Sequence, residues 1–433
     1  MKKVLIITYY WPPAGGPGVQ RVLKFARLLP QFGWQPIVLT VEDGDYPAMD
    51  ESLLQKVPES CRVYRTSILE PYKIYRKLTG KQDSEKLPTF VLNENKNGGL
   101  KNKIATWVRA NVFIPDARIG WIPKATHEGK RILKEENIDL IFASSPPHTV
   151  QLIAKKLAKH SGVPWVADFR DPWTEAFWSA SLKKNRFSSV LDARLEKGVL
   201  KSADAVITVS EGVKDMLGKK AENRYEVIQN GFEPLQDITA DVDTFSILFI
   251  GSLSNYQNPE PLFKSIDSLP SEMQGKVSVS FVGRTYKGFD ELFNSYSHLD
   301  IQRLPYMAHS ELMQFAKKSA LLFRPVAQSA YADKNVGAKT YDYLALRKPI
   351  LTLGVKPSVS QHMLKETASG ELFTYDDIPG IAGFLQRWYA YWQANGTTLL
   401  ANEENLAFYT SEYQVGQLAR LFEELSDKKL KKE

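Results

Sequence analysis

Short apolar runs alternate with amphipathic stretches along most of the 433 residues, a pattern that predicts buried strands connected by helices. In the first half, the expected strands are Val4–Thr8, Pro36–Thr40, Leu140–Ala143, Trp165–Phe169, Ala205–Val209 and Glu226–Ile228. In the second half, they are Ser246–Ile250, Val277–Val282, Ala320–Phe323 and Ile350–Leu353. Because alternating strands and helices form parallel sheets with right-handed crossovers, the sequence predicts an α/β protein.

The two strand series separate near residues 230–243, which predicts two tandem doubly wound, Rossmann-like domains facing a cleft. We expect an N-terminal domain over residues 1–235 and a C-terminal domain over residues 236–400. Residues 401–433 are expected to form a helix that packs back toward the N-terminal domain. The length agrees with this division, because it exceeds what one hydrophobic core usually supports.

Two segments depart from the alternation. Residues 71–99 are rich in Lys, Asn, Asp and Gly, which indicates a mobile surface excursion. Residues 101–125 combine aromatic and cationic side chains, among them Trp107, Trp121, Lys101, Lys103 and Arg109. Core packing of the aromatic residues is the favoured interpretation. The alternative is a basic-aromatic lip that touches lipid headgroups.

The net charge of +7 favours an acidic partner, and anionic lipid or a phosphorylated substrate would qualify. No signature of a nucleic-acid-binding module is present, so nucleic acid is not expected. The sequence contains no run of 18 apolar residues, so a membrane-spanning helix is not expected. We interpret the first apolar run as a strand rather than as a signal peptide. The single cysteine, Cys61, is typical of a reducing compartment. A cytoplasmic location is therefore expected, with a peripheral position at the inner face of the cell membrane as an open alternative.

A glycine-rich turn follows the first strand. Gly15 and Gly16 allow backbone N–H groups to approach a phosphate or sugar without interference from a Cβ atom. The turn does not match the dinucleotide fingerprint G-x-G-x-x-G, and Thr40 rather than an acidic residue ends the next strand. The alternative interpretation is a tight strand-to-helix turn.

A second glycine-led helix start lies at residues 337–345. Lys339 and Asp342 are three residues apart and share a helix face. A lysine at a helix start can bind a diphosphate, helped by the positive end of the helix dipole. A carboxylate one turn later can accept hydrogen bonds from two ribose hydroxyls. The alternative is a surface ion pair.

Polar residues follow two neighbouring strands of the N-terminal half. His148 follows a rigid Pro-Pro turn, and ligands bind at the carboxyl ends of such strands, although a structural role remains an alternative. Asp168, Arg170 and Asp171 end the next strand. We assign Asp168 and Arg170 to acceptor binding and Asp171 to proton abstraction from an acceptor hydroxyl. A simple ion pair of Arg170 with either aspartate is the alternative.

Several motifs together resemble those of a known family. They are PPAGGPGVQRVLKFARLL, SSPPHTVQLIA, PWVADFRDPW, AVITVSEGV, VIQNGFE, ILFIGSL and AKTYDYLALRKPIL. In this order and spacing, which covers both halves, the chain resembles a family-4 glycosyltransferase of the GT-B fold, of the type that builds bacterial lipopolysaccharide or capsule. The resemblance implies transfer of a sugar from a nucleotide sugar, with retention and without a metal. It places the donor mainly on the C-terminal domain and the acceptor on the N-terminal domain.

The resemblance also implies roles for individual residues. Gly15 and Gly16 match the family's glycine turn near the donor diphosphate, and His148 matches a histidine near the reacting sugar. Asp342 matches the second glutamate of the family's paired-glutamate motif, which holds the ribose, and Lys339 matches a lysine that contacts phosphate in some relatives.

The sequence departs from the family at two places. Lys334 stands where the first glutamate of the pair would fall, and Asp333 is a candidate replacement. The loop 251–259 contains no Arg or Lys, so the donor phosphates must be neutralised by other cations, for which Lys339, Arg284 and Arg324 are the candidates.

We therefore expect a hexosyltransferase-like enzyme that moves a sugar from a nucleotide-diphosphate sugar to a lipid-linked or cell-surface glycan. The other histidines show no metal-ligand spacing with cysteine or carboxylates, so neither a metal nor a cofactor is expected. Two alternatives remain: a sugar-nucleotide epimerase of the same fold, and a non-catalytic glycosyltransferase-like partner subunit.

Overall fold

The computed structural model describes residues 1–46, 48–69, 107–108, 110–176, 184–235, 238, 242–329, 331–334 and 336–430. The chain divides into two compact units. Unit 1 comprises Met1–Gln229 and Gln414–Glu433, and unit 2 comprises Asn230–Tyr413. The segment 71–99 and the cations Lys101, Lys103 and Arg109, which the sequence analysis singled out, lie outside the described residues.

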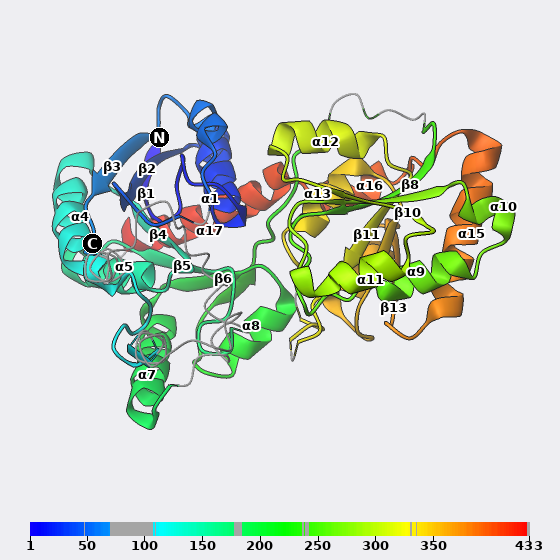
Figure 1. The fold of residues 1–433 in the computed structure, drawn as a ribbon. Helices are drawn as coiled ribbons and strands as arrows, with labels where there is room; N and C mark the ends of the chain where they lie inside the picture. Colours follow the sequence, from blue (N-terminus) through cyan, green and yellow to red (C-terminus); the bar gives the residue numbers. More distant parts are fainter. Residues whose placement is uncertain are drawn as a thin grey trace. The chain divides into compact units, whose positions relative to one another are not determined.

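Unit 1 contains a parallel sheet whose described strands follow the order β3-β2-β1-β4-β5-β6-β7 (Figure 1). Its strands are β1 (Lys2–Ile7), β2 (Trp34–Val41), β3 (Arg62–Thr66), β4 (Leu140–Ser145), β5 (Trp165–Phe169), β6 (Ala205–Thr208) and β7 (Tyr225–Val227). Its helices are α1 (Pro17–Leu28), α4 (Ile122–Glu136), α5 (Thr149–Ser161), α7 (Arg186–Ser202), α8 (Glu211–Gly218) and most of α17 (Ser411–Leu430). Short 3-10 turns lie at Leu29–Phe32, Glu51–Lys56 and Ile119–Trp121.

The central strands of unit 1 are apolar because helices cover both faces of a parallel sheet. The C-terminal helix α17 contributes to this core. The ring of Phe422 lies 5.4 Å from that of Trp34 and 5.7 Å from that of Phe142, measured between centroids. On the rim, the Lys2 ammonium forms an ion pair of 2.6 Å with Glu423. The last helix of the chain therefore completes the unit that the first strand begins.

Unit 2 contains a second parallel sheet with the described order β10-β9-β8-β11-β12-β13. Its strands are β8 (Phe245–Ile250), β9 (Val277–Val282), β10 (Asp300–Leu304), β11 (Leu321–Pro325), β12 (Ile350–Leu353) and β13 (Gly370–Phe373). Its helices are α9 (Glu260–Asp267), α10 (Ser271–Gln274), α11 (Asp290–Ser295), α12 (His309–Lys317), α13 (Lys339–Leu346), α14 (Val359–Glu366), α15 (Ile378–Asn395) and α16 (Glu403–Leu406), with 3-10 turns at Lys287–Phe289 and Ala407–Tyr409.

The predicted fold class, two doubly wound Rossmann-like sheets, is confirmed. In each sheet the strand order reverses next to the first strand, between β1 and β4 in unit 1 and between β8 and β11 in unit 2. Ligands of open α/β sheets bind outside the carboxyl ends of the strands at such a switch point. The topology therefore directs attention to the turns that follow β1 and β4, and to those that follow β8 and β11.

Within the described part of the chain, no helix combines the length and the apolar character needed to cross a membrane.

The two tryptophans of residues 101–125 differ in burial. Trp121 is fully buried in the core of unit 1, whereas more than half of the Trp107 side chain is exposed. The core interpretation is therefore right for Trp121 and wrong for Trp107.

Candidate functional site

The glycine turn of unit 1 lies at the switch point, after β1. The backbone N–H of Gly15 donates to the carbonyl of Ala48 at 2.9 Å. Gly16 precedes α1 with a φ of +91°, and no atom lies within 4 Å of the place where its Cβ would be. A side chain at Gly16 would thus be strained by the backbone and not by its neighbours. The predicted donor contacts of both glycines stay predictions.

His148 precedes α5, after β4, and its side chain is only 6% exposed. The imidazole stacks on the indole of Trp173, with centroids 4.6 Å apart and planes 5° from parallel. Neither ring nitrogen has a hydrogen-bond partner among the residues that the structure describes. Burial lowers the pKa of His148 to about 3, and nearby cations act in the same direction. His148 is therefore a neutral ring that can donate one hydrogen bond and accept another.

The orientation of His148 depends on Trp173, which follows β5, and through it on α7. The Trp173 indole N–H donates to Asp192 at 2.7 Å, and the second carboxylate oxygen of Asp192 forms an ion pair with Lys184. Trp173 and Asp192 are both buried. Because α7 holds the indole and the indole supports the imidazole, the orientation of His148 depends on a helix that begins almost forty residues later in the sequence. Sequence reasoning missed both residues, although the Asp-Pro-Trp string after β5 was part of a quoted motif.

Asp168 lies one residue before the end of β5 and is a fully buried carboxylate. Arg21 of α1 donates to its two oxygens at 3.0 and 2.9 Å, and the hydroxyl of Ser144 donates at 2.7 Å. Arg21 also donates to the carbonyl of Gln229 at 3.0 Å. An acceptor could reach Asp168 only by displacing these partners. We therefore interpret the residue as a support beneath the strand ends rather than as an acceptor ligand. Sequence reasoning missed Arg21, its partner.

Arg170 and Asp171 differ in how their charges are used. The Arg170 guanidinium donates to the carbonyls of Ser145, Gly18 and Pro146 at 3.1, 2.8 and 2.7 Å, and burial lowers its pKa. It ties three turns together instead of forming an ion pair with Asp168 or Asp171. The half-buried Asp171 accepts no hydrogen bond from the described residues, and burial raises its pKa. A carboxylate of raised pKa is a better base, as its predicted role requires.

In unit 2, Lys339 lies at the switch point. β8 ends before Gly251, whose φ of +108° is a conformation that favours glycine. The Lys339 side chain crosses this glycine so closely that a Cβ there would lie 2.1 Å from the ammonium nitrogen. The ammonium is 5.2 Å from the centroid of the Phe249 ring. Burial lowers the pKa of Lys339 to about 8, and repulsion from Arg324 adds to the shift.

The other two candidate cations of unit 2 are placed differently. The buried Arg324 donates to the carbonyl of Val336 and, at 3.3 Å, to the hydroxyl of Ser360. Burial lowers its pKa to about 10. It therefore supports the turn that leads into α13, and donor contact stays a prediction. Arg284 follows β9 as an exposed side chain with no hydrogen bond or ion pair to a described side chain.

Asp342 lies one turn into α13, on the same helix as Lys339. Its side chain is half-buried, and one carboxylate oxygen lies 3.4 Å from Nε2 of His309 at the start of α12. Lys334 stands where the family's first glutamate is expected, and its ammonium lies 5.8 Å from the Tyr331 ring centroid. The structure thus brings Lys339 and Asp342 together at one helix start and leaves the roles of both untested.

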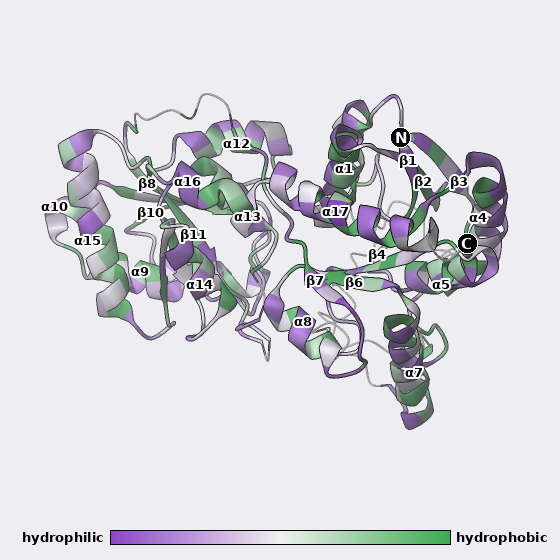
Figure 2. Cartoon of the chain, turned by 180° about the vertical axis from the view of Figure 1, so that it is seen from behind, coloured by the Kyte–Doolittle hydropathy of each residue, from purple (hydrophilic) through white to green (hydrophobic). Residues whose placement is uncertain are grey.

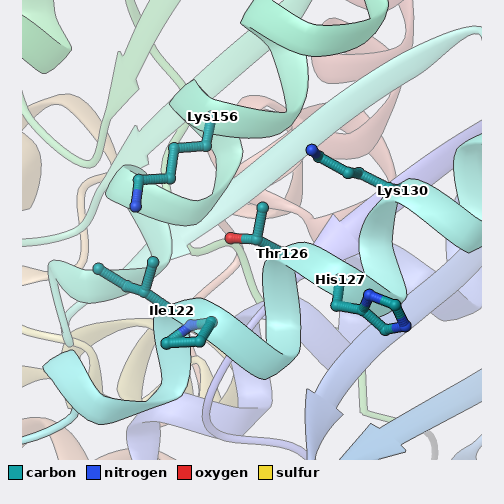
Figure 3. A pocket seen from close by; sticks show the side chains of 6 residues that line it. Ile122, Thr126, His127, Lys130 and Lys156 are labelled. Carbon is teal, nitrogen blue, oxygen red and sulfur yellow. The ribbon is translucent and has the colours of Figure 1, made fainter.

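A shallow hollow of about 340 Å³ lies elsewhere in unit 1, between α4 and α5 (Figure 3). It is lined by Ile122, Pro123, Thr126, His127, Lys130 and Lys156. None of the predicted site residues lines it, so we do not assign it to the reaction. Among the described residues, no group of three or more His, Cys, Asp or Glu side chains is arranged to hold a metal ion.

Comparison with solved structures shows the fold. A sucrose-phosphate synthase from Thermosynechococcus elongatus matches with a TM-score of 0.66 and 15% identity, over 98% of this chain and 99% of that chain. HepE of Anabaena, in complex with UDP and glucose, matches with a TM-score of 0.60 and 14% identity, over 98% and 100%. WaaG, a glycosyltransferase involved in lipopolysaccharide biosynthesis, matches with a TM-score of 0.54 and 12% identity, over 97% and 99%. The chain has the GT-B fold.

The sequence itself matches one family. Residues 89–234 match the model of Glycosyltransferase Family 4, and the matched segment lies almost wholly in unit 1. No curated protein matches the sequence significantly. The predicted resemblance to family 4 is therefore confirmed for this segment, and the predicted GT-B fold for the whole chain.

Proposed function

We propose that this protein is a glycosyltransferase that moves a sugar from a nucleotide-diphosphate sugar to a lipid-linked or cell-surface glycan. The donor nucleotide binds to unit 2 and the acceptor to unit 1. The reaction is hexosyl transfer with retention, and it uses no metal. The family-4 match over residues 89–234 supports the class of reaction, and the UDP bound in the structure of HepE supports the class of donor.

One observation carries the proposal: Lys339 lies across Gly251 at the carboxyl end of β8. The glycine leaves room for the Lys339 side chain beside the backbone. Lys339 is the first residue of α13, whose helix dipole also attracts anions. Asp342 follows one turn later, within reach of the ribose hydroxyls of a nucleotide whose diphosphate contacts Lys339. Arg284 is an additional cation for the phosphates.

In unit 1, His148 supports the acceptor side of the proposal. A buried polar group without a partner costs free energy, and this cost is recovered when a ligand supplies the missing hydrogen bond. The sugar hydroxyls of the substrates are suitable partners for both nitrogens of a neutral imidazole. We assign Asp171, whose pKa is raised by burial, as the base that accepts the proton of an acceptor hydroxyl.

A second candidate function follows from Lys334. Lys334 replaces the family's first glutamate, which favours a non-catalytic partner subunit unless Asp333 holds the donor sugar in its place. Such a protein would still bind a nucleotide but would turn over no donor. Nucleotide binding and turnover must therefore be measured separately.

The test uses the full chain and a panel of UDP-, GDP- and dTDP-sugars. Calorimetry with the free nucleoside diphosphates reports binding, and release of the diphosphate from each sugar nucleotide reports turnover. Binding together with release of one diphosphate is the expected result. Binding without release would favour the partner subunit, and conversion of the donor into another nucleotide sugar would favour an epimerase. Absence of binding to every nucleotide would refute the proposal.

A further inference from the structure

Helix α7 has two chemically different faces. Its acidic residues, Asp192 and Glu196, are each 1% exposed. Asp192 pairs with Lys184, and Glu196 accepts a hydrogen bond of 2.7 Å from Lys220. The negative charges of the helix are therefore neutralised inside unit 1, where α7 supports Trp173 and His148.

The opposite face of α7 is basic and apolar. The exposed cations and large apolar residues of α7 are Arg186, Phe187, Val190, Arg194, Lys197 and Lys201. At 3.6 residues per turn, they fall within an arc of roughly 100° of the helix surface. None of these four cations forms an ion pair with a described residue. The face therefore presents uncompensated positive charge to solvent.

The first turn of α7 carries the apolar part of this face. The side chains of Phe187 and Val190 are 77% and 60% exposed. The segment that contains Trp107 and Val112 lies against the same turn, because Asn111 accepts hydrogen bonds from the Asn185 backbone N–H at 2.6 Å and from the Ser188 hydroxyl at 3.0 Å. Trp107 and Val112 are 55% and 57% exposed. Four large apolar side chains thus face solvent at one end of a basic stripe.

We propose that this surface, the α7 face, docks on a bilayer that contains anionic phospholipid. Cationic side chains beside exposed aromatic residues suit the headgroup region, where Trp and Phe insert and Lys and Arg meet phosphates. Nucleic acid would complement the cations of this face but not its exposed apolar side chains. An apolar protein partner would complement the apolar side chains but not the cations. In Figures 1 and 2, α7 lies at the margin of unit 1, away from the strands of its sheet.

The docking proposal rests on the proposed function, because it explains how the enzyme reaches a lipid-linked acceptor. Vesicle binding is nevertheless measured without any enzymatic assay. An acceptor carried by a lipid has to be met at the membrane, and the α7 face belongs to the unit assigned to the acceptor. The inner face of the same helix holds Trp173 against His148. Docking through α7 therefore brings the acceptor side of the proposed reaction to the lipid surface.

The experiment is sedimentation of the full chain with vesicles, without any substrate. Vesicles of phosphatidylcholine alone are compared with vesicles that also contain phosphatidylglycerol, at low and at high salt. We expect binding to the anionic vesicles only, and weaker binding at high salt. The double variant Arg194→Glu/Lys197→Glu should bind at least about tenfold more weakly, since each cation near an anionic surface contributes a severalfold factor. Phe187→Ser/Val190→Ser should also lower binding, with less dependence on salt.

The matched control is Lys130→Glu/Lys156→Glu. It makes the same change in net charge in the same unit, at the exposed lysines of the hollow between α4 and α5. Binding close to that of the wild type is expected. An equal loss of binding in this control, or equal recovery of the wild type with neutral and anionic vesicles, would overturn the proposal. Diphosphate release without vesicles reports on the proposed reaction separately, so failure of one proposal is distinguished from failure of the other.

Discussion

The two units have the same kind of sheet and place their candidate residues at the same kind of switch point, yet they use cationic side chains differently. In unit 1, Arg21 and Arg170 donate to groups of the protein itself, and the neutral His148 has no hydrogen-bond partner among the described residues. In unit 2, the ammonium of Lys339 lies over a glycine at a helix start, and Arg284 is exposed. Of the three candidate cations of unit 2, the buried Arg324 resembles the arginines of unit 1, because it donates to groups of the protein itself.

The difference indicates a division of labour. A neutral imidazole in an apolar surrounding recognises hydroxyl groups, as a sugar requires, and a desolvated cation recognises phosphate. Fold class alone would not separate the two units, because function depends on the site and not on the fold.

Arg21→Ala should have the largest effect, and the effect should be on stability. Removing one partner of a buried ion pair leaves an uncompensated charge, which costs about 3–5 kcal/mol. Urea denaturation followed by tryptophan fluorescence reports mainly on unit 1, because only Trp388 and Trp392 of the nine tryptophans lie in unit 2. Lys339→Ala, the control in unit 2, should leave this transition unchanged. If Arg21→Ala, like the control, left the unfolding transition unchanged, the supporting role of the Arg21–Asp168 pair would be contradicted.

His148→Ala should lower kcat by roughly a hundredfold, the effect of losing one hydrogen bond made in the transition state. The affinity for the nucleoside diphosphate should hardly change, since that ligand is assigned to unit 2. His160→Ala provides the matched control, because His160 is an exposed histidine on the same helix. A wild-type kcat in a folded His148→Ala variant would show that the residue is structural.

The same residue makes a prediction about pH. With its pKa lowered to about 3, His148 stays neutral throughout the assay range, so its own titration should not shape the pH–rate profile. If His148→Gln removes an acid limb near pH 6.5, the pKa of a free histidine, the ring titrates normally and its burial has been misinterpreted.

Asp342→Ala should weaken nucleotide binding by roughly 1.5–3 kcal/mol, because a charge-assisted hydrogen bond to the ribose is lost. Calorimetry with a nucleoside diphosphate and its 2′-deoxy analogue sharpens the test. The wild type should prefer the ribose form, and the variant should bind both forms alike. His309→Ala, at the 3.4 Å neighbour of Asp342, is the control and should keep the preference. An unchanged affinity in Asp342→Ala would remove the ribose assignment.

A smaller effect is expected when the pH rises. The protonated form of Lys339 binds phosphate, so donor affinity should be constant well below the pKa of about 8 and should fall above it. The limiting slope is about tenfold per pH unit, because one proton is lost. Lys339→Arg keeps its charge and should flatten this dependence between pH 7 and pH 9. A slope that persists in Lys339→Arg would assign the titration to another group.

No effect is expected from chelation. The proposed reaction neutralises the leaving diphosphate with Lys339, Arg284 and the dipole of α13, so EDTA should leave the rate unchanged. If EDTA abolishes activity and Mn²⁺ restores it, the first candidate for metal binding is Asp43-Gly44-Asp45, which follows β2 and carries two carboxylates at D-x-D spacing. Substitution of Asp43 and Asp45 would then be the next measurement.

The sequence predicted the buried strands well and the edge strands poorly. All of the expected strands are present, within a few residues at their ends. Three observed strands were not expected: β3 (Arg62–Thr66), β10 (Asp300–Leu304) and β13 (Gly370–Phe373). These lie at sheet edges and are partly exposed, so they lack the continuous apolar run that identifies a strand covered on both faces.

The positions of the candidate site residues at strand ends could be predicted from the sequence. The side chains that surround these residues could not. The strand-helix order places His148 and Lys339 at strand ends, and this much follows from pattern. The stack of Trp173 on His148 and the bonds of Arg21 to Asp168 join residues that are 25 and 147 positions apart. Contacts of this kind depend on tertiary packing, which local periodicity does not encode.

The return of the chain from unit 2 to unit 1 has a consequence for biosynthesis. When the ribosome has finished the first 229 residues, the sheet of unit 1 is complete, but Trp34 and Phe142 lack Phe422, which packs on them only after α17 is made. At about 5–20 residues per second, translation of the 184 residues between these events takes roughly 10–40 s. Throughout this interval the nascent unit 1 exposes an apolar strip that α17 later covers. Such a strip is a natural binding site for a chaperone, and a transcript truncated before α17 should yield a protein that aggregates.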